Sequence, residues 1–154
     1  MRAFVALQLE PADAKRLHAW SVRALEKVPG ARRIRGDELH VTLVFCDDID
    51  EERAGELVVA AEEVEPAFAG TAFAPSRVVR FGGAIAVLLD PVDPDATGRL
   101  VAAQEALARR LVAAGLAPDD RTGSWTPHVT VARTRDPKAR VDAVAPPPGP
   151  VHVA

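Results

Sequence analysis

Two of the four histidines in this chain open the same short pattern of residues. The stretches LHVTLVF and PHVTVAR each carry a threonine two positions after the histidine, which pairs His40 with Thr42 and His128 with Thr130. Because side chains on a β-strand alternate between its two faces, each stretch, read as a strand, presents one imidazole and one hydroxyl on the same side. One such pair is a weak signal, but two pairs in matching strands point to a shared site.

Two imidazoles on opposite sides of a cleft suit in-line displacement at a phosphorus atom. A histidine with an unperturbed pKa of about 6.5 can be neutral or protonated at neutral pH, so one ring can act as base and the other as acid. The hydroxyls of Thr42 and Thr130 can donate hydrogen bonds to the non-bridging phosphate oxygens, where negative charge is held in the transition state. This chemistry requires no metal and no cofactor.

Strict alternation also assigns the other side chains of the two strands. It places Val44 and Cys46 beside His40, Ala132 beside His128, and Phe45 in the core with Val41 and Leu43. Arg133 is the nearest arginine that could add a charge-assisted contact to the phosphate. Alternation puts it on the face opposite His128, so it reaches the site only if the strand twists, bulges or ends there.

The periodicity of apolar residues predicts alternating strands and helices around these motifs. In the first half we expect a strand over 4–9, a helix from Pro11 to the stop at Pro29-Gly30, a strand over 39–46, and a helix capped by Asp50 and ended by Pro66. In the second half we expect strands around 71–73 and 78–81, a Gly82-Gly83 turn, a strand over 84–89, a helix over about 95–114 and a strand over 128–134. The final VHVA, after a proline-rich stretch, is typical of a strand that begins but is not completed.

The two halves share one plan. AFVALQLEP, a helix and LHVTLVF correspond to AIAVLLDP, a helix and PHVTVAR. An internal repeat of this kind predicts two similar units related by an approximate two-fold axis, with the two histidines facing each other across the interface. We therefore expect residues 1–154 to form one domain of two similar lobes, with the proline-rich residues 143–154 as a tail.

Composition limits the remaining possibilities. The chain has 154 residues, 48% of them hydrophobic, a formal net charge of −3 and one cysteine, Cys46, which excludes an internal disulfide and a multi-cysteine zinc site. Arg32, Arg33 and Arg35 are either a local positive patch or a solvated strand edge. No apolar run is long enough to cross a membrane and no signal peptide is evident, so we expect a cytoplasmic protein. Cys46 is interpreted as a packing residue, and no nucleotide-binding glycine motif is present, so ATP should not be needed.

The paired HVTL and HVTV, the opening MRAFVAL, and PHVTVAR after a long helix resemble the two-histidine (2H) phosphoesterase superfamily. Within it they resemble the bacterial RNA 2′,3′-cyclic phosphodiesterases, also called 2′-5′ RNA ligases, over about residues 1–135. The resemblance implies an α+β, bilobal, pseudo-two-fold fold in which two mainly antiparallel sheets flank a central cleft, with helices on the outside. Members open a 2′,3′-cyclic phosphate on RNA to a 2′-phosphomonoester, and some join or cleave 2′-5′ linkages in tRNA halves.

Carried onto this sequence, the resemblance makes His40 the acid that protonates the leaving 3′ oxygen and His128 the base that activates water. Thr42, Thr130 and Arg133 would bind the phosphate, and Phe4 would be a stacking platform for a base. The chain departs from the family after the second motif, where members usually continue with further strands. Either a neighbouring chain completes that lobe or one sheet is smaller, with an exposed edge.

Three other interpretations stay open at this point. The chain could be a non-catalytic module that binds RNA ends or nucleotides, or a phosphodiesterase for a small cyclic phosphate such as a nucleotide or an ADP-ribose derivative. A metal site is disfavoured because the two histidines have no evident third ligand. The expected partner is RNA with a 2′,3′-cyclic phosphate end, such as a tRNA-like fragment, or a small cyclic nucleotide, with no membrane involved.

Overall fold

The computed structural model describes residues 2–119 and 124–154. In chain order its elements are β1 (Phe4–Gln8), α1 (Pro11–Ala24), β2 (Arg32–Arg33), η1 (Gly36–Glu38), β3 (His40–Phe45), α2 (Glu51–Phe68), β4 (Ala72–Phe81), β5 (Ala84–Pro91), η2 (Pro94–Ala96), α3 (Thr97–Ala113), β6 (His128–Arg133) and β7 (Val151–His152). None of the helices in the described ranges is both long and apolar enough to span a membrane.

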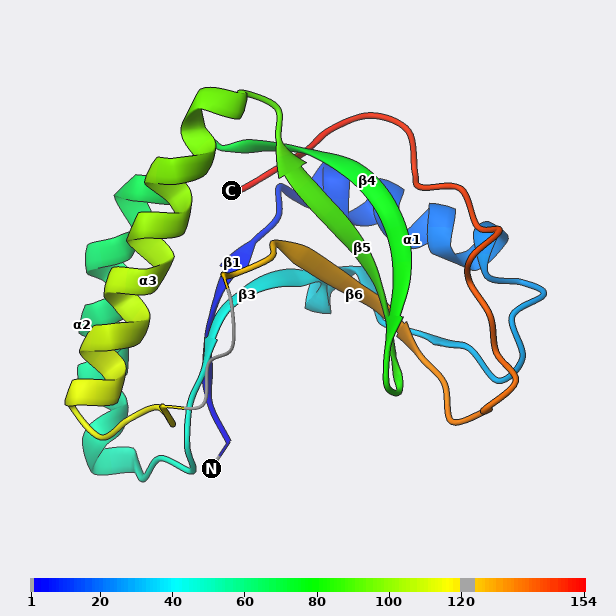
Figure 1. Cartoon of the computed structure of the whole chain (residues 1–154). Helices are drawn as coiled ribbons and strands as arrows, with labels where there is room; N and C mark the ends of the chain where they lie inside the picture. The colour runs from blue at the N-terminus through cyan, green and yellow to red at the C-terminus, as the bar shows by residue number, and fades with distance from the viewer. Residues whose placement is uncertain (1, 120–123) are drawn as a thin grey trace.

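The strands form one seven-stranded antiparallel sheet in the order β1-β3-β6-β5-β4-β7, with β2 paired to β6 (Figure 1). The two lobes meet at β3 and β6, whose register gives one Cα pair, Val41 with Val129. The α+β fold is thus confirmed, and the two expected sheets are joined into a continuous one at this pair.

The pairing register repeats between the two lobes. On β1 and β3, Gln8 pairs with His40 and Ala6 with Thr42. On β5 and β6, Leu88 pairs with His128 and Ala86 with Thr130 in the same way. The approximate two-fold axis therefore passes through the Val41–Val129 pair, at the centre of the sheet.

Each lobe's helix covers the other lobe's motif strand. Helix α3 packs against β3, helix α1 packs against β6, and α2 lies beside α3 and β1 (Figure 1). The buried residues of α3 recur at helical spacing, with Leu100, Leu107 and Leu111 almost fully buried. Burying a leucine contributes roughly 1.5–3 kcal/mol, so these helices fix the back of the strands whose front carries the polar residues.

Helix α2 extends past Pro66, where it was expected to end, and strand β4 contains a proline in its interior. Helix α2 continues beyond Pro66 to Phe68, whose fully buried ring meets Trp125 edge-on at 5.9 Å and holds the last turn in place. Strand β4 is a single ten-residue strand rather than two, and a register shift between Pro75 and Arg77 accommodates the proline, which lacks a backbone N–H. Burial of Phe68 thus keeps the helix intact beyond Pro66, and the register shift keeps the strand intact around Pro75.

The VHVA stretch forms a short strand at the edge of this sheet. β7 pairs with β4, and Val153 forms a bridge with Leu9 just beyond β1. The backbone N–H of Glu10 donates to the His152 carbonyl at 2.8 Å, and the Ala154 N–H donates to the Gln8 carbonyl at 2.9 Å. The tail therefore fills the gap between β4 and the end of β1 within the same chain.

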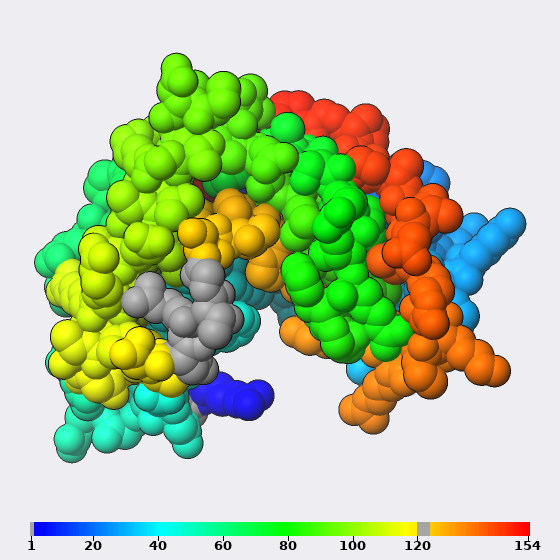
Figure 2. Space-filling model, in the orientation of Figure 1, coloured from blue at the N-terminus to red at the C-terminus, as the bar shows by residue number. Residues whose placement is uncertain are grey.

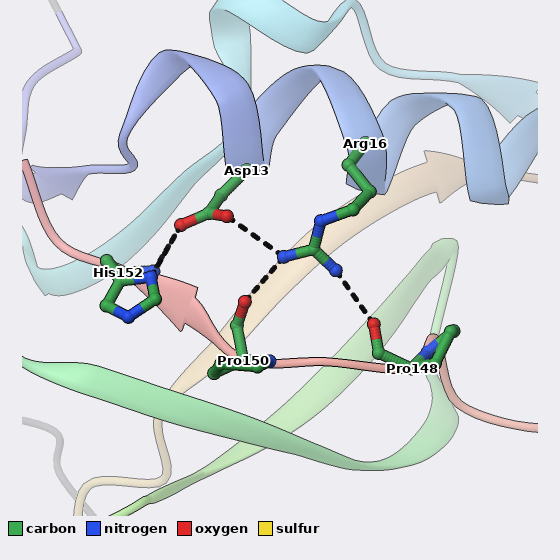
Figure 3. A network of polar contacts seen from close by, with 5 residues as sticks. All are labelled: Asp13, Arg16, Pro148, Pro150 and His152. Carbon is green, nitrogen blue, oxygen red and sulfur yellow. Dashed lines mark hydrogen bonds and ion pairs between the residues drawn. The ribbon is translucent and has the colours of Figure 1, made fainter.

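Side chains of α1 hold this tail (Figure 3). Asp13, 14% exposed, accepts hydrogen bonds from the backbone N–H and the Nδ1 of His152 at 2.8 and 2.9 Å, and one from Arg16 at 2.9 Å. Arg16 also donates to the carbonyls of Pro148 and Pro150. Partial burial raises the pKa of the Asp13 carboxyl, but the hydrogen bonds from Arg16 and His152 outweigh it, so this pKa lies below its ordinary value of 3.8.

Candidate active site

A cleft of about 670 Å³ lies on the face of the sheet that carries the two motifs. It is lined by Phe4, Ala6 and Gln8 of β1, by Ile34, Asp37, Glu38 and Leu39, by His40, Thr42 and Phe45 of β3, and by His128, Thr130 and Arg133 of β6. Figure 2 shows the molecule hollowed between the N-terminal strand, in blue, and the β4–β5 hairpin, in green. The structure therefore brings all six site residues predicted from the sequence to one cavity.

Both histidines are held in the same way by the backbone. The Nδ1 of His40 lies 2.7 Å from the Glu38 carbonyl oxygen, and the Nδ1 of His128 lies 2.9 Å from the Thr126 carbonyl oxygen. A carbonyl oxygen can only accept a hydrogen bond, so Nδ1 of each ring carries the hydrogen. This leaves Nε2 of each ring as the nitrogen that can exchange protons with a bound molecule.

The antiparallel register places each threonine beside the histidine of the other motif. Val41 pairs with Val129 in antiparallel orientation, so the preceding residue His40 lies on the side of Thr130 and the following residue Thr42 on the side of His128. At ideal strand spacing, diagonal neighbours such as the two histidines have β-carbons roughly 7–8 Å apart. Two imidazoles and two hydroxyls can therefore surround a group the size of a phosphate.

Each motif strand has a bulge directly after its threonine. On β3 the register with β1 skips Leu43, and on β6 the register with β5 skips Val131. A bulge inserts one extra residue and reverses the alternation of side chains beyond it. As a result, two consecutive residues in each strand are buried, Leu43 with Val44 and Val131 with Ala132.

The carbonyl groups of both bulged residues have hydrogen-bond partners. The Leu43 carbonyl accepts from Nε2 of Gln104 at 2.8 Å, and Gln104 on α3 is itself 5% exposed. The Val131 carbonyl accepts from the Ile34 backbone N–H at 2.9 Å. The bulges are thus held in place from both lobes.

Because of the bulges, the side chains that follow them lie on the opposite face of the strand from the one that strict alternation predicts. Arg133 lines the cleft together with His128, which is the outcome expected if the strand bulges. The core assignment of Phe45 is wrong, since its side chain is 68% exposed and lines the cleft. Val44 and Ala132 are buried on the opposite side rather than beside the histidines.

Exposed phenylalanines flank both histidines. Phe4 stacks on His40 with ring centroids 4.9 Å apart, and Phe45 lies 6.2 Å from Phe4 in a tilted arrangement. Phe81, half exposed, meets His128 edge-on at 5.5 Å. Sequence reasoning found Phe4 but missed Phe45 and Phe81, and the position of Phe81 directly before the glycine turn was the available signal.

Cys46 lies outside the lining of the cleft and packs against the core. Partial burial raises the pKa of the Cys46 thiol, and the negative charge of Asp47 raises it further. A raised pKa lowers the fraction of reactive thiolate, which agrees with a packing role. Within residues 2–119 and 124–154, no group of three or more His, Cys, Asp or Glu side chains is placed to hold a metal ion.

Comparison of the sequence with known families assigns the chain to a class of proteins. Residues 9–147 match the family model of the 2′-5′ RNA ligase superfamily, so the chain belongs to that superfamily of 2H phosphoesterases. Comparison with curated proteins gives no match.

Solved structures share the fold at low sequence identity. LigT from Escherichia coli, crystallised with 3′-AMP, superposes with a TM-score of 0.70 at 18% identity, covering 97% of this chain and 83% of that one. TT0787 from Thermus thermophilus gives a TM-score of 0.57 at 21% identity, covering 95% and 79%. The PDE domain of MHV ns2 gives 0.59 at 14% identity, covering 90% and 87%.

Proposed function

We propose that this protein hydrolyses 2′,3′-cyclic phosphate ends of RNA to 2′-phosphomonoesters, with His40 as acid and His128 as base. The observation that carries the proposal is that two imidazoles face one cleft, each with its Nδ1 hydrogen committed to a backbone carbonyl. Both rings therefore present Nε2, the atom through which a proton can be accepted or donated.

In the proposed reaction, water attacks the phosphorus in line with the 3′ oxygen. His128 Nε2 accepts a proton from the water as the new P–O bond forms, and His40 Nε2 donates its proton to the 3′ oxygen as the P–O3′ bond breaks. The product carries a 2′-phosphate and a 3′-hydroxyl. No change of oxidation state occurs, and we propose that no metal or cofactor takes part.

The remaining lining residues stabilise the phosphate and the nucleoside. Thr42 and Thr130 donate hydrogen bonds to the non-bridging oxygens, and the guanidinium of Arg133 adds a charge-assisted contact. Within the described residues, Arg133 has no ion pair or protein hydrogen bond that would compete. Phe4 provides a face on which a base can stack, although stacking against His40 already covers part of its ring.

We further propose that a tRNA-like fragment or a small cyclic nucleotide serves as substrate. Related LigT structures contain 3′-AMP, NADP+ or ATP, which supports a site for nucleotides. If an RNA 5′-hydroxyl replaces water beside His128, the same proton transfers give a 2′-5′ phosphodiester, so the site also supports ligation. The cytoplasmic location expected from the sequence stays a prediction.

The test is an assay on a short RNA that ends in a 2′,3′-cyclic phosphate, with the product identified by its phosphate position. We expect a 2′-phosphate, formed equally well in the presence of a metal chelator. A 3′-phosphate product would mean that the P–O2′ bond breaks and that the 2′ oxygen, rather than the 3′ oxygen, is protonated. Loss of activity in chelator would contradict the metal-free mechanism. Binding without turnover would favour a module that only binds RNA ends.

A further inference from the structure

The arginine cluster found in the sequence divides between the two faces of β2. Arg33 donates hydrogen bonds to the carbonyls of Ala31 and Val22 at 3.1 Å each, and so ties β2 to the end of α1. Arg35 forms an ion pair with Asp37 at 2.7 Å. Arg32 has neither kind of contact among the residues that the structure describes.

The register of β2 places Arg32 on the cleft side of the sheet. Arg32 pairs directly with Arg133 of β6, and direct cross-strand partners have side chains on the same face. Ile34, two residues further along, lines the cleft with Arg133. Arg33 alternates to the other face, where its contacts with α1 are found.

Two arginines opposite each other on one sheet face repel, which is unfavourable when neither has a counter-charge. Arg32 and Arg133 stand in this relation, and neither is paired to a carboxylate in the described part of the chain. An anion bound beside them would relieve the repulsion. The pair therefore has the character of a site for a phosphate group.

The position of Arg32 indicates which phosphate this would be. β3 and β2 lie along the same edge of β6, β3 at Val129 and β2 at Arg133. Those positions are four residues apart, or roughly 10–13 Å along a strand that carries one bulge. The reacting phosphate already has Thr42, Thr130 and Arg133 around it, so Arg32 lies beyond it, at the distance of a neighbouring group of the substrate.

We propose that Arg32, beside Arg133, binds a second phosphate, the 5′-phosphate or 5′-phosphodiester of the nucleotide whose cyclic phosphate is opened. The inference rests on the proposed function for the location of the reacting phosphate. It makes Arg32 a specificity-determining residue that favours an RNA end over a nucleoside cyclic phosphate with a free 5′-hydroxyl.

The experiment compares cytidine 2′,3′-cyclic phosphate with and without a 5′-phosphate. The wild-type kcat/KM should be at least about tenfold higher for the 5′-phosphorylated compound, as a charge-assisted hydrogen bond can provide. In Arg32→Gln this ratio should approach one, and in Arg32→Lys part of it should remain. Arg109→Gln makes the same change of charge on the exposed side of α3 and should keep the full ratio.

Two outcomes would overturn the inference: a wild-type enzyme with no preference, or an Arg32→Gln variant that loses activity on both compounds to the same extent. Calorimetry can also compare the affinities for cytidine 2′-monophosphate and cytidine 2′,5′-bisphosphate. Because binding needs no turnover, this measurement tests the second phosphate site separately from the proposed function. Tighter binding of the bisphosphate that Arg32→Gln abolishes supports the second site even if hydrolysis is absent. Hydrolysis without any such difference refutes the second site and leaves the proposed function intact.

Discussion

At the scale of single residues, the backbone decides which atoms of the site are free to react. The carbonyls of Glu38 and Thr126 each occupy one nitrogen of a histidine and thereby fix its tautomer and its orientation. The same contact occurs at both motifs because both histidines start equivalent strands in a repeated register. This symmetry gives two similar rings, so in the proposed mechanism the bound substrate determines which one serves as acid.

Removing either ring should abolish most of the hydrolysis. General acid–base catalysis contributes roughly 10²–10⁴-fold, so we expect His40→Ala and His128→Ala each to lower kcat on a cyclic phosphate by that factor. The double variant should be little worse than either single variant, because the two rings act in one step. Strictly multiplicative losses, measured in the same assay, would contradict a shared step.

The dependence of kcat/KM on pH should have two limbs. In the proposed mechanism, activity should fall at low pH because the base His128 must be neutral, and at high pH because the acid His40 must be protonated. The residual activity of His40→Ala should lose the alkaline limb, and that of His128→Ala the acid limb. Persistence of both limbs in both variants would assign the titration to other groups.

At the scale of elements, the bulges after the two threonines determine what reaches the cleft. The histidines and threonines could be predicted because they precede the bulges, where alternation holds. Phe45 and Arg133 follow them, and a period-two pattern does not reveal the extra residue. The available signal was a pair of consecutive apolar residues at the same place in both motifs, Leu43-Val44 and Val131-Ala132.

The bulge on β3 should depend on Gln104. Replacing Gln104 with Leu leaves the Leu43 carbonyl buried without a partner, which should cost roughly 1–3 kcal/mol of unfolding free energy. Urea unfolding monitored by circular dichroism measures this loss. Arg109→Met, on the exposed side of the same helix, should change the unfolding free energy by less than about 0.5 kcal/mol. Equal stability of the two variants would show that the bulge needs no support from α3.

At the scale of the whole molecule, the C-terminal tail joins the two ends of the sheet. The sequence pattern predicted the start of a strand there but not its partners, because VHVA is short and follows a proline-rich stretch. Its position depends on Asp13 and Arg16, which lie far away in the sequence and leave no local pattern. The repeat and the helices, by contrast, follow from periodicities within each segment.

The contribution of Asp13 should depend on pH. Because its folded-state pKa lies below the ordinary value of 3.8, ionised Asp13 stabilises the fold above that value, and this stability is lost as the pH falls through the folded-state pKa. Asp13→Asn should therefore lower the unfolding free energy by roughly 1–2 kcal/mol near neutral pH. Urea titrations at a series of pH values should show the gap from wild type closing below 3.8. Asp142→Asn, at an exposed position, serves as control, and a gap that stays constant with pH would disprove the role of the carboxylate.

The pairing of Leu9 with Val153 also constrains when this protein can finish folding. During synthesis β1 leaves the ribosome long before residues 152–154, which form hydrogen bonds with Gln8 and Glu10 at the end of β1. Contacts so distant in sequence form slowly, because the entropy cost of closing a long loop comes before the favourable energy of the contacts. A nascent chain thus carries its motif strands in an unclosed sheet until residues 151–154 emerge, and a ribosome stalled before that point would display an N-terminal lobe accessible to proteases.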